Sequence, residues 1–87
     1  ESIHLYQNYP NPFNPTTTIE FAISKTGRYS LSLYNALGEL VKEISDKEYE
    51  AGYYKESFNA YGLPSGMYFY RLIGNDANIA RKMVVLR

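Results

Sequence analysis

The chain has 87 residues, with nine basic and nine acidic side chains, ten tyrosines and no cysteine. This length makes one domain, and the balanced charge argues against nucleic-acid binding, which depends on basic residues that neutralise phosphates. Without cysteine the chain forms no disulfide and no thiolate metal site, and no apolar run reaches the roughly 18 residues that a membrane-spanning helix needs. The sequence opens at Glu1 without the basic and apolar regions of a signal peptide. Because its first residue is also not methionine, we expect it to be one piece of a longer protein.

The segment before the first long predicted strand is rich in proline. Its run Asn11-Pro12-Phe13-Asn14-Pro15 follows another proline at position 10. Each proline fixes its own φ, lacks a backbone N–H and pushes the preceding residue toward extended geometry. We therefore expect residues 1–15 to be a stiff lead-in with a first strand, residues 16–87 to form a sandwich, and Phe13 to anchor the lead-in onto its core.

Two strands with alternating apolar residues follow this segment. One face of Thr16–Ile23 carries Ile19, Phe21 and Ile23, and one face of the next strand carries Tyr29, Leu31 and Leu33. Turn residues, including Gly27, separate the two strands. The pattern predicts that these strands form a hairpin with a short loop.

The stretch from Leu37 to Glu50 is ambiguous between helix and strand. Its apolar residues are spaced as in a helix, but Gly38 stands near its start and the apolar period lasts only about two turns. The local pattern leaves both structures open. Residues 46–50 read as a solvated loop rather than a metal site.

The second half of the chain alternates again. Residues 53–58 form a strand, residues 62–66 a turn that contains Gly66, residues 67–73 the most strand-like run, and residues 79–87 a final strand after a hairpin loop. Six or seven short strands, with turn signals about every 8–12 residues, predict an all-β antiparallel sandwich. Its expected core comprises Ile19, Phe21, Ile23, Leu31, Leu33, Val41, Phe58, Tyr68, Tyr70, Leu72, Met83 and Val85.

No convergent set of titratable groups suggests catalysis, so we expect no enzyme, no cofactor and no metal site. The only histidine, His4, reads as an exposed or edge-strand residue rather than part of a catalytic triad. Residues 75–78 space oxygen donors as calcium loops do, but they offer one carboxylate and read as a hairpin turn. Glu56 falls on a face expected to be apolar, so it either lies at an edge or, as we favour, pairs with Arg71 or Lys82.

Exposed tyrosines on a sandwich can stack on sugars, because the ring has an apolar face and a polar tip. Tyr53, Tyr61 and Phe69 are the residues that could form such a platform. Packing in the core and between strands is the commoner use of tyrosine, and we assign Tyr29, Tyr34, Tyr68 and Tyr70 to it.

Several segments together resemble the C-terminal sorting domains of type IX secretion, type A. The resemblance lies in Asn8 to Ile19, in Leu31 to Val41, in Ala51-Gly52 with Gly62 to Leu72, and in Lys82 to Arg87. They follow the family's order over nearly the whole chain. The pattern is also similar to the immunoglobulin-like domain of the flagellar hook-capping protein.

The resemblance implies a seven-stranded immunoglobulin-like sandwich, and for that reason Leu40 to Ile44 is assigned to a strand. It also implies a non-catalytic module at the C-terminus of a larger secreted protein, which reaches the cell surface or the medium through the periplasm and the outer membrane. Its partners would be the outer-membrane type IX machinery and covalently linked N-terminal cargo domains. Cleavage of the module, or attachment of the cargo to surface lipopolysaccharide, can follow in this family. Glu56 departs from the family pattern, which has an apolar residue there.

A translocon cannot read buried side chains, so we expect it to read edges or tails. The last strand, with its free carboxylate, is the candidate handle, because an exposed strand edge can pair with a partner sheet. The predicted recognition residues are Lys82, Met83, Val84, Val85, Leu86 and Arg87, with Gly38 and Gly66 serving turns. Two alternatives stay open at this point: a passive immunoglobulin-like spacer, and a carbohydrate-binding module of a secreted glycoside hydrolase. Edge-strand self-association also stays possible.

Overall fold

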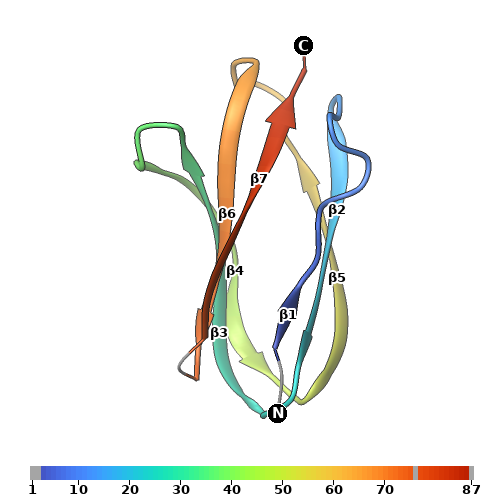
Figure 1. Ribbon diagram of the computed structural model, residues 1–87, viewed down its shortest axis with the longest axis vertical. Coiled ribbons are helices and arrows are strands. Elements are labelled where there is room, and N and C mark those ends of the chain that lie inside the picture. Colours follow the sequence, from blue (N-terminus) through green and yellow to red (C-terminus); the bar gives the residue numbers. More distant parts are fainter. Residues whose placement is uncertain (1–2, 76, 87) are drawn as a thin grey trace.

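The computed structural model describes residues 3–75 and 77–86. It contains seven strands (Figure 1), which in chain order are β1 (His4–Leu5), β2 (Thr16–Ile23), β3 (Gly27–Asn35), β4 (Leu40–Tyr49), β5 (Gly52–Asn59), β6 (Gly66–Gly74) and β7 (Ala77–Val85). The described residues include no helix that is long and apolar enough to cross a membrane.

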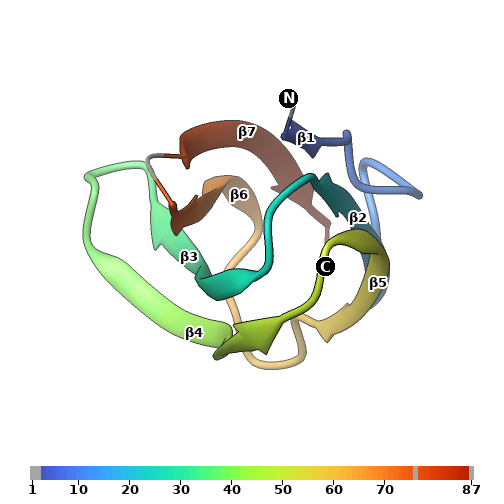
Figure 2. The same cartoon turned by 90° about the horizontal axis from the view of Figure 1, so that it is seen from below.

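The strands form two antiparallel sheets that face each other. One sheet has the order β1-β2-β5, and the other has the order β4-β3-β6-β7. Seen along the strands, the two sheets curve around a common interior (Figure 2). The predicted all-β, immunoglobulin-like sandwich is therefore confirmed. In constant-type immunoglobulin domains the fourth strand joins the sheet that holds the first two strands. Here β4 instead pairs with β3 in the other sheet.

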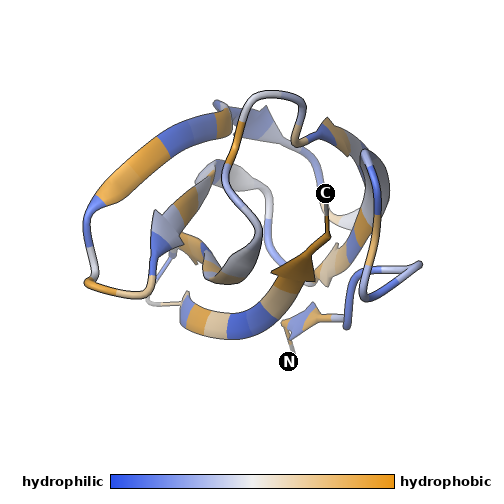
Figure 3. Cartoon of the chain, turned by 90° about the horizontal axis from the view of Figure 1, so that it is seen from above, coloured by the Kyte–Doolittle hydropathy of each residue, from blue (hydrophilic) through white to orange (hydrophobic). Residues whose placement is uncertain are grey.

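The core lies between the sheets because side chains alternate along each strand. On β2 the buried residues are Thr17, Ile19, Phe21 and Ile23, and on β6 they are Tyr68, Tyr70 and Leu72. Figure 3 shows bands of hydrophobic and hydrophilic residues along the strands. All of the predicted core residues are buried except Val41, which is only partly buried and packs against the core. Tyr29, which was assigned to packing in the core and between strands, is also buried, and the structure adds Leu5, Tyr49 and Ala60 to the core.

The predicted hairpin between the second and third strands is wrong. β2 pairs with β1 and β5, whereas β3 pairs with β4 and β6, so the two strands lie in different sheets. Each strand already has a neighbour on both edges, and residues 24–26 cross from one sheet to the other. A turn signal shows that the chain reverses, but it does not show which sheet the next strand joins.

The ambiguous stretch after Gly38 is a strand, as the resemblance implied. β4 runs to Tyr49, so the expected loop at residues 46–50 is strand over most of its length. Register shifts fall between Leu31 and Ser32 and between Leu33 and Tyr34, where β3 pairs with β4. Such irregularities break the two-residue alternation of an edge strand. They explain why Val41 is not fully buried and why the local sequence shows no clean strand period.

Candidate recognition surface at the last strand

The predicted recognition residues lie on β7 and just beyond it, at one edge of the four-stranded sheet. Met83 and Val85 point into the core and are 0% and 2% exposed. Lys82 and Leu86 are exposed, and Val84 is half-buried. Arg87 lies outside the described residues. Two of the six predicted residues thus build the core, and only their neighbours can be contacted from outside.

The proline-rich segment lies along the same edge of β7. We call residues 7–15 the arm. The backbone N–H of Phe13 donates to the carbonyl of Val84 at 3.1 Å, and the N–H of Leu86 donates to the carbonyl of Phe13 at 2.9 Å. Phe13 and Val85 form an isolated parallel bridge. The arm therefore continues the four-stranded sheet for a short distance beyond β7.

Side-chain amides complete this contact where proline cannot. The Asn11 side-chain oxygen accepts a hydrogen bond from the Val84 N–H at 2.9 Å. The Gln7 side chain donates to the Lys82 carbonyl at 2.6 Å. Because prolines lack a backbone donor, a segment with three of them cannot form a regular ladder, and amide side chains take that role here.

A buried polar cluster fixes the start of the arm. Asn8 is 2% exposed, and its side chain donates to the Thr17 hydroxyl at 2.9 Å and to the Pro10 carbonyl at 3.1 Å. Its backbone N–H donates to the Tyr70 hydroxyl at 2.8 Å, which in turn donates to the Tyr6 carbonyl at 2.7 Å. Burial raises the pKa of Tyr70 to about 12, so the phenol stays protonated and keeps donating.

Most residues of the segments that carry the family resemblance meet where the arm contacts the end of β7. Asn14 and Pro15 line a hollow of about 280 Å³ together with Tyr61, Val85 and Leu86. Gly66 begins β6 and pairs with Val85. The Tyr68 side chain is 6% exposed, and its hydroxyl donates to the Pro64 carbonyl.

Gly38 is the motif residue that lies apart from the rest. It occupies the turn between β3 and β4, which lie toward the opposite edge of the sheet from β7, and its φ is +87°. This conformation favours glycine. Its place is therefore in a turn and not in the surface formed by the arm and β7.

Sequence reasoning missed the polar residues that hold the arm in place, namely Gln7, Asn8, Thr17 and Tyr70 in its hydrogen-bonding role. A usable signal was present, because amide residues alternate with prolines in this segment and a donor-free backbone needs side-chain partners. The partners themselves lie far away in the chain and carry no local signal.

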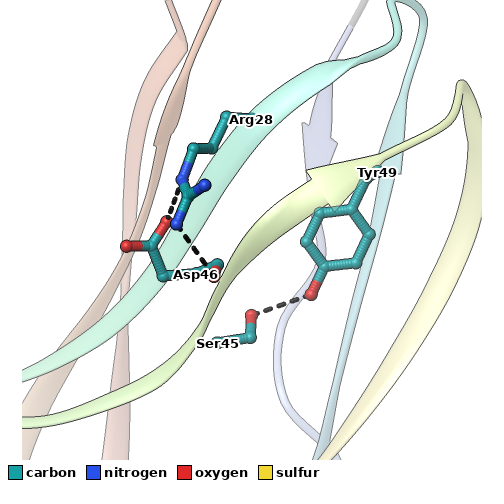
Figure 4. A network of polar contacts seen from close by, with 4 residues as sticks. All are labelled: Arg28, Ser45, Asp46 and Tyr49. Carbon is teal, nitrogen blue, oxygen red and sulfur yellow. Dashed lines mark hydrogen bonds and ion pairs between the residues drawn. The ribbon is translucent and has the colours of Figure 1, made fainter.

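The expected pairing of Glu56 with Arg71 or Lys82 is wrong. The Tyr49 hydroxyl donates to the Glu56 carboxylate at 2.8 Å, and the Ser45 hydroxyl lies 2.8 Å from the Tyr49 oxygen (Figure 4 draws the Ser45 contact). Arg71 donates instead to the side-chain oxygen of Asn78. β4 and β5 are edge strands of the two sheets, so Tyr49 and Glu56 meet where those edges approach each other.

Tyr49 is held in its neutral form at this junction. Burial raises its pKa to about 12, and the Glu56 carboxylate acts in the same direction, whereas the hydrogen bond from Ser45 acts against both. Nearby, Arg28 and Asp46 form an exposed ion pair of 3.0 Å across β3 and β4 (Figure 4). An exposed pair of this kind contributes little to stability.

The three residues of the alternative sugar platform are not brought together. Tyr53 lies near the start of β5 and Tyr61 beyond its end, which at about 3.3 Å per residue places them at opposite ends of the sheet. Phe69 belongs to β6 in the other sheet. The partners of Tyr53 are instead Tyr6, whose ring centroid is 6.3 Å away, and the Glu20 carboxylate.

The residues that the structure describes contain no group of three or more histidine, aspartate or glutamate side chains that could hold a metal ion. His4 is exposed on the edge strand β1, where its ring stacks on Tyr6 with centroids 5.9 Å apart.

Comparison with known proteins gives one family. The model of a family described as the secretion system C-terminal sorting domain matches residues 7–86. Searches of curated proteins and of solved structures give no match. The matched range begins at Gln7 and ends at Leu86. Gln7 is also the first arm residue that bonds to residues 82–86, and Leu86 is the last residue that bonds to the arm.

Proposed function

Because this chain belongs to the family of secretion system C-terminal sorting domains, it serves as a sorting signal for type IX secretion, and we propose that the secretion machinery recognises it at the surface formed by β7 and the arm. The family implies attachment to a cargo protein, interaction with the type IX machinery, and export to the cell surface or the medium. The family is not catalytic.

The proposal includes a route and a domain organisation. The domain follows N-terminal cargo, crosses the inner membrane with it, and is recognised at the outer membrane from the periplasm. Cleavage of the domain, or anchoring of the cargo, follows recognition. The proposal assigns no catalytic step and no cofactor to this chain.

The observation that carries the proposed recognition surface is the joining of two family segments at one edge. Lys82 to Leu86 and Asn11 to Pro15 lie far apart in the sequence, yet backbone hydrogen bonds connect them. Met83 and Val85 hold the last strand in the core, so recognition falls to Lys82, Leu86 and the exposed residues of the arm. Arg87, which lies outside the described residues, belongs to the same proposed tail.

Export of a reporter tests the sorting role. The 87 residues are fused behind a periplasm-directed fluorescent protein in a bacterium with type IX secretion and in a strain without its translocon. We expect fluorescence outside the cell or on its surface only when the translocon is present. Retention in the periplasm of both strains, with the domain folded, would contradict the sorting role and return the spacer and the sugar-binding module as explanations.

Substitutions locate the recognised surface better than truncation does. Removal of residues 85–87 deletes the buried side chain of Val85 and the hydrogen bond from the Leu86 N–H to the Phe13 carbonyl. A loss of export in that variant could therefore reflect unfolding. Lys82→Ala and Leu86→Ala alter exposed side chains and leave the core intact. We expect these two variants to fold normally and to be exported less than Lys55→Ala, an exposed lysine on β5. Export equal to that of the control would place recognition elsewhere on the domain.

A further inference from the structure

Only part of the outer edge of β7 is closed by the arm. The backbone groups that bond to the arm belong to Lys82, Val84 and Leu86, which are every second residue along β7 and just beyond it. Because backbone groups of a strand point alternately to its two edges, the N–H and C=O of Ala80 and Asn78 face this same outer side. The sheet order gives β7 no strand neighbour there. Among residues 3–75 and 77–86, no hydrogen bond reaches these backbone groups of Asn78 and Ala80, or the N–H of Lys82, from the outer side, although β1 contacts β7 and its Leu5 carbonyl accepts a hydrogen bond from Arg81. We call this part of β7, from Asn78 to the N–H of Lys82, the open edge.

The open edge carries positive charge. From residue 77 to residue 87 the sequence has three basic residues and no acidic one. Arg81 reaches across to donate to the Leu5 carbonyl at 2.5 Å. Within the described residues, the one ion pair joins Arg28 to Asp46, so no carboxylate neutralises Arg81 or Lys82.

The acidic side chains of the sheet lie at its other edge. Residues 39–50, which include β4, hold five acidic and two basic side chains. Since β4 and β7 are the two edge strands of one sheet, a chain with no net charge carries opposite charge at the two edges. An approaching strand with carboxylates is thus attracted to β7 and repelled by β4.

The surface next to the open edge is hollowed and partly apolar. A shallow groove of about 540 Å³ is lined by Gln7, Met67, Phe69, Ala80, Arg81 and Lys82. Met67 is 46% exposed. The groove offers apolar contact beneath the basic side chains, and Ala80 is small enough to let another backbone approach.

We propose that the open edge of β7, from Asn78 to Lys82, receives an extended acidic segment of the secretion machinery as an added strand. The backbone of that segment pairs with Ala80 and its neighbours, and its carboxylates lie beside Lys82 and Arg81. The inference rests on the proposed function and names the chemistry of the partner at that site. The arm blocks the other half of the edge, so it sets where the added strand can begin.

Proline at position 80 tests the backbone pairing. Ala80→Pro removes the outward N–H and places a ring in the path of the added strand, without removing a hydrogen bond to β6, and proline is tolerated in this way at sheet edges. Ala80→Ser keeps the N–H and is the matched control. We expect the reporter fused to Ala80→Pro to be exported at least about tenfold less than the serine control, which corresponds to about 1.4 kcal/mol of lost affinity. Circular dichroism and thermal unfolding establish that both variants fold.

Charge reversal tests the chemistry of the partner and does not depend on the behaviour of proline. We expect Lys82→Glu to reduce export strongly and Lys55→Glu, on the other sheet, to leave it unchanged. A synthetic peptide that alternates glutamate with threonine should shift the amide resonances of residues 78–82 in the isolated domain at low salt. The corresponding lysine–threonine peptide should not.

The outcomes separate the inference from the proposed function. If the unmodified reporter is not exported, the proposed function fails and the inference fails with it. If the unmodified reporter is exported and both Ala80→Pro and Lys82→Glu match their controls, the sorting role stands and the added strand is wrong. If the isolated domain self-associates in sedimentation experiments and Ala80→Pro abolishes this, the occupant is a second copy that presents its acidic β4, which overturns the proposed partner.

Discussion

The hydroxyl of Tyr70 joins two segments of the chain, because it accepts a hydrogen bond from the Asn8 N–H at 2.8 Å and donates one to the Tyr6 carbonyl at 2.7 Å. Tyr70 lies in the middle of β6 and is fully buried. The start of the arm is thus bound to the center of the larger sheet, while the end of the arm is bound to β7. The arm is part of the folded domain and not a linker in front of it.

Removal of the Tyr70 hydroxyl should loosen the arm. Tyr70→Phe leaves the buried N–H of Asn8 without its acceptor, and an unsatisfied buried donor costs about 1–3 kcal/mol. We expect the free energy of unfolding in urea to fall by that amount. Tyr61→Phe, at a side chain that is 89% exposed, is the control and should change nothing measurable. Equal stability of the two variants would show that the hydroxyl contributes no stability.

Phe13 should matter as much as a central core residue. It is 2% exposed, and its ring packs edge-on against Phe58 with centroids 6.4 Å apart. Phe13→Ala removes a buried ring and leaves a cavity, which costs about 3–5 kcal/mol. Leu37→Ala, at a position 84% exposed, should stay within about 0.5 kcal/mol of the parent. Thermal unfolding of the two variants checks the difference, and a small loss for Phe13→Ala would mean that the arm is dispensable for the core.

Stability should decline at high pH because of two buried tyrosines. The pKa values of Tyr49 and Tyr70 are each raised from 10.0 to about 12 in the folded protein. A raised pKa means that the folded state holds the proton more tightly than the unfolded state, so this contribution is complete below pH 10 and is lost as the pH rises toward 12.

Urea unfolding at a series of pH values measures this decline. We expect the double variant Tyr49→Phe/Tyr70→Phe to show a smaller loss of unfolding free energy than the parent between pH 10 and pH 12. Parallel curves for the parent and the double variant would assign the high-pH loss to other groups.

Gly74 should not tolerate a side chain. A Cβ built on it would collide with the Arg28 carbonyl and would lie 2.7 Å from Cδ2 of Tyr29. The first neighbour is backbone and cannot rotate away, so Gly74→Ala should destabilise the domain by about 1–3 kcal/mol. The matched control is Gly27→Ala, whose Cβ meets only the side chain of Asn75. The midpoints of denaturant unfolding compare the two, and a larger loss for Gly27→Ala would contradict the argument.

The sequence predicts the strands well because alternation is a local property. Ile19, Phe21 and Ile23 are buried on β2 as the period of two requires, and Tyr68, Tyr70 and Leu72 are buried on β6 in the same way. Sheet membership is not local, which is why the predicted hairpin between β2 and β3 was wrong. Glu56 shows the same limit, because its partner Tyr49 lies on an edge strand of the opposite sheet.

The candidate site was predicted only in outline. The motif residues around Phe13 and those from Lys82 onward stand out in the sequence, but nothing local indicates that they pair with each other. Their contact depends on tertiary structure, in which amides at Gln7 and Asn11 satisfy backbone groups of β7 that a proline-rich partner cannot. The division of β7 into a closed and an open half likewise becomes visible only in the structure.

The contact between Phe13 and Val85 has a consequence for when the signal comes into existence. The arm is synthesised early and β7 last, so the arm cannot close until nearly all of the domain has been made. A copy that stops before β7 lacks Met83 and Val85 and leaves the ring of Phe13 without part of its cover. Only a chain that includes β7 can therefore hold the arm in the position that the complete domain gives it.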